Sequence, residues 1–155
     1  MPGLLHLLRG LFGRAEAPAG PRSALVGQWG EDQAAVFLEA KGFSLLGRNV
    51  RPNRHDEIDL VARSGDVLVF VEVKTRRRED FARPVRAVDR AKRHALNRAA
   101  AAYLRKAGYP DLFYRFDVVE VLGQPEDGAP VIRHLDNAFP FEARLRFPVQ
   151  RSGSE

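Results

Sequence analysis

Two carboxylates and one lysine occur at spacings that suit phosphate chemistry. Asp59 lies in a segment of alternating polar and apolar residues, and Glu72 and Lys74 end an almost wholly apolar run that begins at Val67. Successive side chains point to opposite faces of a strand, so Glu72 and Lys74 share one face. Carboxylate oxygens suit Mg²⁺ or Mn²⁺, which activate water, and a lysine beside them neutralises charge on a phosphate. The set predicts metal-dependent cleavage of a phosphodiester.

The turn between the two segments sets the register of the acids. Residues 64–66 are Ser, Gly and Asp, and a two-residue hairpin loop there sets Asp59 opposite Glu72. Opposed side chains have Cβ atoms about 5 Å apart, so two carboxylates repel each other unless a cation lies between them. In the alternative, both acids lie at strand ends in solvent, and Glu57 and Lys74 form a surface pair worth under about 1 kcal/mol. We prefer the hypothesis of a functional site, because Glu72 and Lys74 end a very apolar strand, where burial of unpaired charge would be costly.

Glu31 is a third candidate acid, in a segment with helical spacing. In a helix it stacks with Ala35 and Leu38 on the side that faces the core, where a carboxylate needs a reason. Two roles remain open from spacing alone. Glu31 is either a further ligand of the metal or a cap for backbone groups beside Gly27 and Gly30.

Positive charge is concentrated directly after the apolar run. Residues 74–106 contain twelve Lys or Arg against three Asp or Glu, and the whole chain has a net charge of +5. Contacts of such residues with phosphates give affinity for nucleic acid without sequence specificity. The alternatives are a solvated arginine-rich helix and, for Lys92, a stem that covers apolar surface. The residues expected to contact nucleic acid, with DNA as the expected partner, are Arg76, Arg77, Arg78, Arg86, Arg90, Lys92 and Arg93.

The elements that must position these side chains follow one another in the order α, β, β, β, α, β, β. Hydrophobic periodicity predicts helices over residues 25–41 and 85–107. Strands are predicted over residues 43–50, 56–63, 67–74, 114–122 and 131–135. The run 67–74 is too continuously apolar for an exposed edge strand, so we expect it in the centre of the sheet with both faces covered. Arg115 and Asp117 project to the same side of their strand, and we expect them to pair and brace the sheet.

Length and composition favour one domain. The chain has 155 residues and 45% hydrophobic residues, enough for a single core. It has no cysteine, which excludes disulfides and thiolate metal sites, and no nucleotide-binding loop, Ser-His-Asp set or zinc pattern. The apolar segment 4–12 is too short to cross a bilayer. We expect a flexible leader over 1–22, the functional domain over 23–140, a tail over 141–155, and a cytoplasmic location without membrane attachment.

Several short segments resemble a bacterial protein family, the YraN-like family. These are GQWGE at 27–31, RNVR at 48–51, EIDL at 57–60, VFVEVK at 69–74, RFDV at 115–118 and HLDNAF at 134–139. The resemblance covers roughly residues 27–139. The YraN-like family is in turn similar to archaeal-type Holliday junction resolvases, within the PD-(D/E)xK nuclease superfamily. Two positions depart from the pattern: Asp56 and Ala82 stand where, or near where, the family has glycine.

The resemblance implies both a fold and an activity. The implied fold is α/β, a restriction-endonuclease-like core whose mixed sheet has the order α-β-β-β-α-β and is flanked by helices. The implied activity is a Mg²⁺- or Mn²⁺-dependent DNA endonuclease with a preference for junction or branched DNA, with a homodimer by analogy. The alternative is a non-catalytic nucleic-acid-binding module in DNA processing or uptake. The implied catalytic residues are Glu31, Asp59, Glu72 and Lys74, with Asp59, Glu72 and Glu31 as metal ligands.

Overall fold

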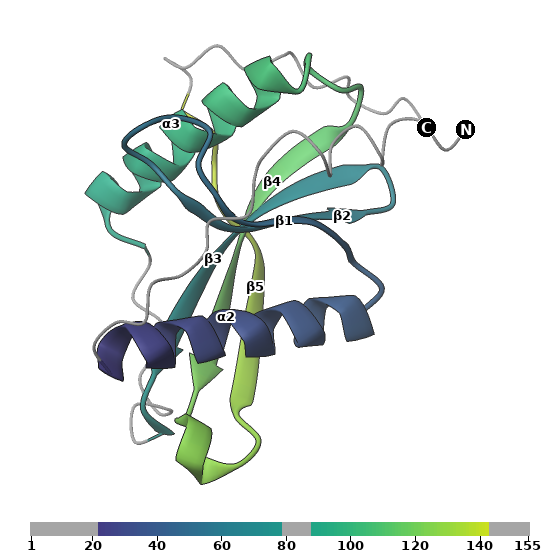
Figure 1. Cartoon of the computed structure of the whole chain (residues 1–155). Helices are drawn as coiled ribbons and strands as arrows, with labels where there is room; N and C mark the ends of the chain where they lie inside the picture. The colour runs from purple at the N-terminus through teal and green to yellow at the C-terminus, as the bar shows by residue number, and fades with distance from the viewer. Residues whose placement is uncertain (1–21, 79–87, 143–155) are drawn as a thin grey trace.

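The fold is α/β, with a mixed five-stranded sheet between two helices (Figure 1). The structure is a computed structural model, and it describes residues 22–78 and 88–142. The elements of these residues are α2 (Arg22–Ala40), β1 (Ser44–Val50), β2 (Ile58–Ser64), β3 (Val67–Arg76), α3 (Arg90–Lys106), β4 (Phe113–Leu122), the short 3₁₀ helix η2 (Pro125–Asp127) and β5 (Val131–Phe139). The predicted order of helices and strands is confirmed, and the arrangement agrees with a restriction-endonuclease-like core.

Strand β3 is the central strand, as its apolar sequence predicts. The sheet order is β1-β2-β3-β4-β5. Strands β1, β2 and β3 are antiparallel neighbours, β3 and β4 are parallel, and β4 and β5 are antiparallel. A parallel pair needs a long crossover connection, and α3 lies in the one that joins β3 to β4.

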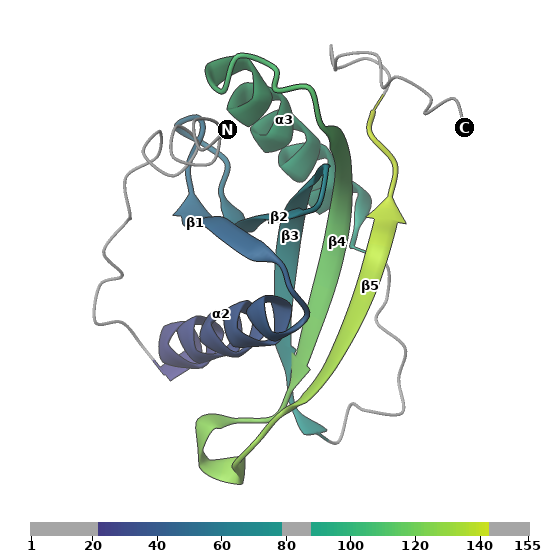
Figure 2. The ribbon, with the colours of Figure 1, turned by 90° about the vertical axis from the view of Figure 1, so that its right-hand side faces the viewer.

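The two helices cover opposite faces of the sheet (Figures 1 and 2). On one face, Leu96 and Tyr103 of α3 belong to a cluster that contains Phe70 of β3. On the other face, Leu38 of α2 belongs to a cluster that contains Val71 of β3. Neighbouring residues of β3 therefore face different helices, and both faces of the strand are covered as predicted.

A glycine lets α2 approach the end of β3 closely. A Cβ atom on Gly30 would lie 1.8 Å from the hydroxyl oxygen of Thr75 in β3. No side chain fits in that space, so Gly30 is required by packing. The contact sets the distance between α2 and the sheet. It therefore also positions Glu31, the residue that follows Gly30 in α2.

The β2–β3 hairpin has the predicted register. Ser64 pairs with Val67, and the ladder continues to Leu60 opposite Val71. Gly65 has φ of 60°, which suits a tight hairpin turn. Continuing the same count sets Asp59 opposite Glu72, at the end of the paired region.

Several boundaries differ from the sequence-based expectation. Helix α3 begins at Arg90 rather than at residue 85, because Asp89 caps it and accepts a hydrogen bond from the backbone N–H of Lys92 at 2.8 Å. Strand β5 continues to Phe139 rather than ending at residue 135, because Phe139 pairs with Phe116 and stacks on its ring. The expected leader before residue 22 and most of the expected tail lie outside the described residues. Within the described residues, no helix is long and apolar enough to cross a membrane.

Candidate active site

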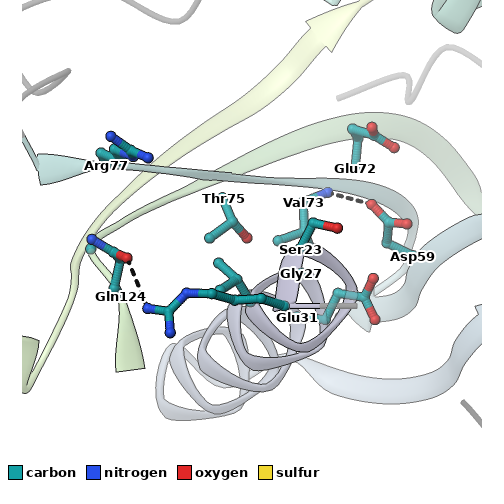
Figure 3. A pocket seen from close by; sticks show the side chains of 12 residues that line it. Ser23, Gly27, Glu31, Asp59, Glu72, Val73, Thr75, Arg77 and Gln124 are labelled. Atoms are coloured by element: carbon teal, nitrogen blue, oxygen red, sulfur yellow. Dashed lines mark hydrogen bonds between the residues drawn. The ribbon is translucent and has the colours of Figure 1, made fainter. Parts of the chain in front are cut away.

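Three carboxylates from three elements meet at one end of a pocket. Glu31 comes from α2, Asp59 from β2 and Glu72 from β3, and all three line a cavity of about 590 Å³ (Figure 3). The antiparallel hairpin brings Asp59 and Glu72 together, and the close packing of α2 on β3 adds Glu31. The structure therefore brings the three predicted acids to one cavity, and their catalytic and metal-binding roles stay predictions.

Asp59 is held in place by the neighbouring strand. Its Oδ2 accepts a hydrogen bond from the backbone N–H of Val73 at 2.7 Å, just past the pair of Leu60 with Val71 that ends the ladder of the hairpin (Figure 3). Burial raises the pKa of Asp59, while the hydrogen bond from Val73 and the charge of Lys92 act in the opposite direction. The carboxylate is therefore fixed in direction and costly to ionise without a cation beside it.

Glu72 is a buried acid whose pKa is also raised. Its side chain is buried, and Oε2 has no hydrogen-bond partner among the described residues. Burial, and then the negative charge of Asp59, raise the pKa of Glu72 to about 8, although Lys92 and Lys74 lower it. At neutral pH the Asp59–Glu72 pair therefore tends to retain a proton, which a bound cation would displace.

Glu31 is a partly buried acid on the other side of Asp59. Burial and the charge of Asp59 raise the pKa of Glu31 to about 7, against the lowering effect of a hydrogen bond with Asn49. Asn49 has the positive φ of 48°, which turns its side chain out of the regular pattern of β1. Glu31 thus lies close enough to Asp59 for the two charges to interact, as its role at the site requires.

The carboxylates fit a hard divalent cation. Mg²⁺ is typically bound through one or two protein carboxylates, with waters and substrate phosphates completing its shell. Asp59 and Glu72 would supply these two carboxylates, and Oε2 of Glu72, which accepts no hydrogen bond within the described residues, is an available ligand atom. Across residues 22–78 and 88–142, no group of three or more acidic or histidine side chains is arranged to hold a metal ion. Glu31 as a third direct ligand stays a prediction.

Two lysines lie near the acids. The ammonium nitrogen of Lys92, in the first turn of α3, is 3.5 Å from Oε2 of Glu72. Lys74 follows Glu72 by two residues in β3, and its charge also lowers the pKa of Glu72. The sequence left Lys92 open between the site and an apolar surface, and the ion pair with Glu72 places its charge at the site.

The arginines that follow β3 lie in different surroundings. Arg77 lines the pocket (Figure 3). Arg76 pairs with the fully buried Glu120 of β4 at 3.0 Å, so it has a bracing role that the sequence did not reveal. Arg78 donates a hydrogen bond to the backbone carbonyl of Ala129. Of these three, Arg77 is the one at the pocket.

The predicted nucleic-acid contacts Arg90 and Arg93 belong to α3 and differ in exposure. Arg90 is exposed at the first position of α3. Arg93 is partly buried, and its Nε has no hydrogen-bond partner in the described part of the chain. Arg86 and Ala82, on which sequence-based expectations also rest, lie outside the described residues. The contacts of these arginines with nucleic acid stay predictions.

The sequence matches a known family over most of this architecture. The model of the uncharacterised protein family UPF0102 matches residues 30–121, from Glu31 and its neighbours in α2 to the end of β4. The chain belongs to the UPF0102 family. A UPF0102 protein of Symbiobacterium thermophilum is 50% identical over 117 residues, which are 76% of this chain and 98% of that protein. UPF0102 proteins of Geobacter sulfurreducens and Syntrophomonas wolfei are each 44% identical, over 74% of this chain and 88% and 96% of their own lengths.

Other functional candidates of this UPF0102 protein were not visible in its sequence. The pocket wall also contains Ser23, Gly27, Thr75 and Gln124, which come from three separate segments. No local pattern marks them, because a serine, a threonine or a glutamine carries no signal of its own. Gly27 was the one accessible clue, since a glycine inside a helical pattern needs a packing or functional reason.

Two charged clusters outside the pocket brace the UPF0102 fold. The predicted pair of Arg115 and Asp117 is confirmed, with Nε 2.9 Å from Oδ1, and Asp117 also contacts Nε2 of His134 at 2.8 Å. Asp56, where the sequence resemblance predicts glycine, accepts hydrogen bonds of 2.7 and 3.1 Å from Arg98 of α3. The second pair ties the segment before Asp59 to α3, the helix that carries Lys92.

Proposed function

We propose that this UPF0102 protein is a Mg²⁺- or Mn²⁺-dependent DNA endonuclease that prefers junction or branched DNA. The observation that carries the proposal is the meeting of the buried acids Glu72 and Asp59 in a pocket, where Oε2 of Glu72 makes no hydrogen bond within the described residues and only an ion pair of 3.5 Å with Lys92. A purely structural acid in such a place would be satisfied by donors. A carboxylate that binds a metal ion needs an oxygen atom that is not already hydrogen-bonded.

The electrostatics of the pocket support the same proposal. The pKa values of Glu31 and Glu72 are raised to about 7 and about 8, and that of Asp59 is raised as well. Perturbed acids clustered in a cavity are typical of functional sites. Burial is the main cause of all three shifts, and a divalent cation between Asp59 and Glu72 would offset the cost of ionising these buried acids.

The residues of the chain would divide the work as follows. Asp59 and Glu72 would hold the metal, which when bound lowers the pKa of its water and polarises the phosphate. Glu31, with a pKa of about 7, is suited to accept a proton at neutral pH. Lys74 would neutralise charge that develops on the phosphate, and Arg77 at the pocket would bind a neighbouring phosphate of the strand.

The expected setting of the activity follows from the same proposal. A two-fold symmetric four-way junction suits a homodimer, in which each copy cuts one strand. A DNA-processing enzyme with these properties would act in the cytoplasm. The non-catalytic alternative uses the basic residues in the same way but has no need of Asp59 or Glu72.

The experiment that tests the proposal is a cleavage panel with matched variants. Labelled single-stranded, duplex, flap and four-way-junction DNA are incubated with Mg²⁺, Mn²⁺ or EDTA and with wild type, Asp59→Asn or Glu39→Gln. Glu39 is exposed on α2 and serves as the control carboxylate. We expect metal-dependent cutting that Asp59→Asn abolishes and Glu39→Gln leaves intact. Salt-sensitive binding without any cutting would instead favour the binding module, and cutting that survives in Asp59→Asn would sink the assignment of the site.

A further inference from the structure

The pocket continues well beyond the carboxylates. Glu72 and Asp59 lie at one end in Figure 3, and Arg77 and Gln124 lie at the other, with Thr75 and the side of α2 between them. A hydrated divalent ion and one phosphate need the room of about ten waters, or roughly 300 Å³ at about 30 Å³ per water. The cavity of about 590 Å³ therefore has space for a further group of the ligand.

The lining of this further space suits a group with hydrogen-bonding edges that is flanked by a phosphate. Two arginines, Arg22 and Arg77, line it as well, and Arg22 is paired with Glu126 at 2.9 Å. Ser23 and Thr75 offer hydroxyls and Gln124 offers an amide, which between them can both donate and accept. Val26 and Val73 add apolar surface. The arginines suit the phosphates of a strand, and the hydroxyls, the amide and the apolar surface between them suit a sugar and base, which present donors, acceptors and an apolar face.

Gly27 keeps this space open. A Cβ atom at position 27 would meet no heavy atom within 4 Å, in contrast to Gly30, where it would collide with Thr75. Glycine inside a helix costs roughly 1 kcal/mol relative to alanine. No neighbouring residue requires glycine at position 27, so packing does not explain this loss of helix stability. A ligand that lies against the backbone of α2 would explain it, because glycine permits close approach.

We propose that this part of the pocket holds one unpaired nucleotide of the substrate strand, next to the phosphate at Asp59 and Glu72. The inference rests on the proposed nuclease function and specifies its substrate. A base that is stacked and paired in a duplex does not reach into a pocket, so the nucleotide must be unpaired or extruded from the helix. Arg77 at the far end then contacts the phosphate that follows this nucleotide. The substrate class is DNA with an unpaired nucleotide at the cut, as in a flap, a junction or a single strand.

Filling the space at Gly27 tests this inference by binding alone. The variant Gly27→Leu puts a side chain into the pocket, and Ala24→Leu puts the same side chain on an exposed position of α2 that does not line the pocket. Binding of a labelled single-stranded oligonucleotide and of a blunt duplex is measured by fluorescence anisotropy in EDTA. We expect Gly27→Leu to weaken single-strand binding at least tenfold, to leave duplex binding within about twofold and not to lower Tm. Ala24→Leu should match wild type.

Two further arms keep the outcome decisive. If Gly27→Leu lowers Tm, the variant Gly27→Ala is used in its place. One methyl group fits the open space without contact, and alanine favours the helix. We then expect a loss of about threefold in single-strand affinity. A deoxynucleoside monophosphate is added as a competitor. Competition at the concentration where the oligonucleotide binds would overturn the assignment to a strand. Wild-type affinity in a folded Gly27→Leu would overturn the subsite itself.

The same experiment separates the subsite from the nuclease proposal. Glu72→Gln should lose cutting and keep single-strand binding, whereas Gly27→Leu should lose single-strand binding and keep the rise of Tm with Mg²⁺. If wild type cuts nothing but Gly27→Leu still loses single-strand binding, the nuclease proposal fails and the subsite stands. If wild type cuts and Gly27→Leu cuts flap and duplex substrates at unchanged rates, the subsite fails and the nuclease stands.

Discussion

Replacing Glu72 by glutamine should stabilise the metal-free protein, and more so as the pH rises. The amide keeps the shape of the protonated acid but cannot ionise beside Asp59. Glu72 has a pKa of about 8 in the fold against an ordinary value of 4.5. Between these values the folded state binds more protons than the unfolded state, so the stability that Glu72 contributes falls as the pH rises through this window.

The size of the effect follows from the same shift. One pKa unit corresponds to about 1.4 kcal/mol, so the full shift of Glu72 sets an upper limit of roughly 5 kcal/mol between acid and alkaline pH. The expected difference is smaller than this limit, because water reaches part of the pocket and because Asp59 stays buried in both proteins and its ionisation costs stability in both. We therefore expect a differential stabilisation on the order of 2 to 3 kcal/mol at pH 9 relative to pH 5.

Urea unfolding followed by circular dichroism gives the required measurement. Wild type, Glu72→Gln and the exposed-site control Glu39→Gln are unfolded in EDTA at intervals from pH 5 to pH 9. Wild type should lose stability across this range, and Glu72→Gln should lose less. A second series with Mg²⁺ at pH 8 should stabilise wild type but not Glu72→Gln, because binding to the folded state alone stabilises it. Parallel pH curves for wild type and Glu72→Gln would refute the claim that this carboxylate is desolvated beside Asp59.

Three other substitutions probe the surroundings of the site. Lys92→Met removes the ammonium group 3.5 Å from Glu72, which raises the pKa of Glu72 further, so the acid limb of the pH–rate profile should move to higher pH. An unmoved limb would show that Lys92 acts elsewhere. Arg77→Ala should weaken DNA binding several-fold and reduce the slope of log affinity against log salt by about one, as titration at several salt concentrations would reveal. Arg98→Ala leaves the buried Asp56 without its charged partner, with only Asn53 donating to its side chain, and should cost about 2 kcal/mol in urea unfolding; Asp56→Asn should restore most of this in the double variant.

Much of the fold was predictable because its signals are local. The period-2 pattern of β2 and the continuous apolar run of β3 identify both strands. The Gly65–Asp66 turn fixes their register, so the neighbouring positions of Asp59 and Glu72 follow from counting. The helical period of α2 likewise places Glu31 on the side that faces the sheet.

Boundaries were less predictable where distant contacts decide them. Strand β5 extends to Phe139 because that ring stacks on Phe116 of β4, with 4.6 Å between the ring centroids. Helix α3 starts at Arg90 because Asp89 caps it, although the apolar spacing of the residues before Asp89 also predicts a helix. In each case a specific contact overrode a repeating pattern.

The sequence by itself determined the order of the elements, the central strand, the pairing of Asp59 with Glu72 and the membership of a family. Only the tertiary structure decided what surrounds those acids. The ion pair of Lys92 with Glu72 depends on how the crossover lays α3 across the sheet. The opposite wall of the pocket depends on Gly30, which lets α2 descend onto Thr75 and brings Gly27 toward Gln124. Such contacts join segments far apart in the chain, and their geometry is set by packing and not by any period or spacing that a sequence displays.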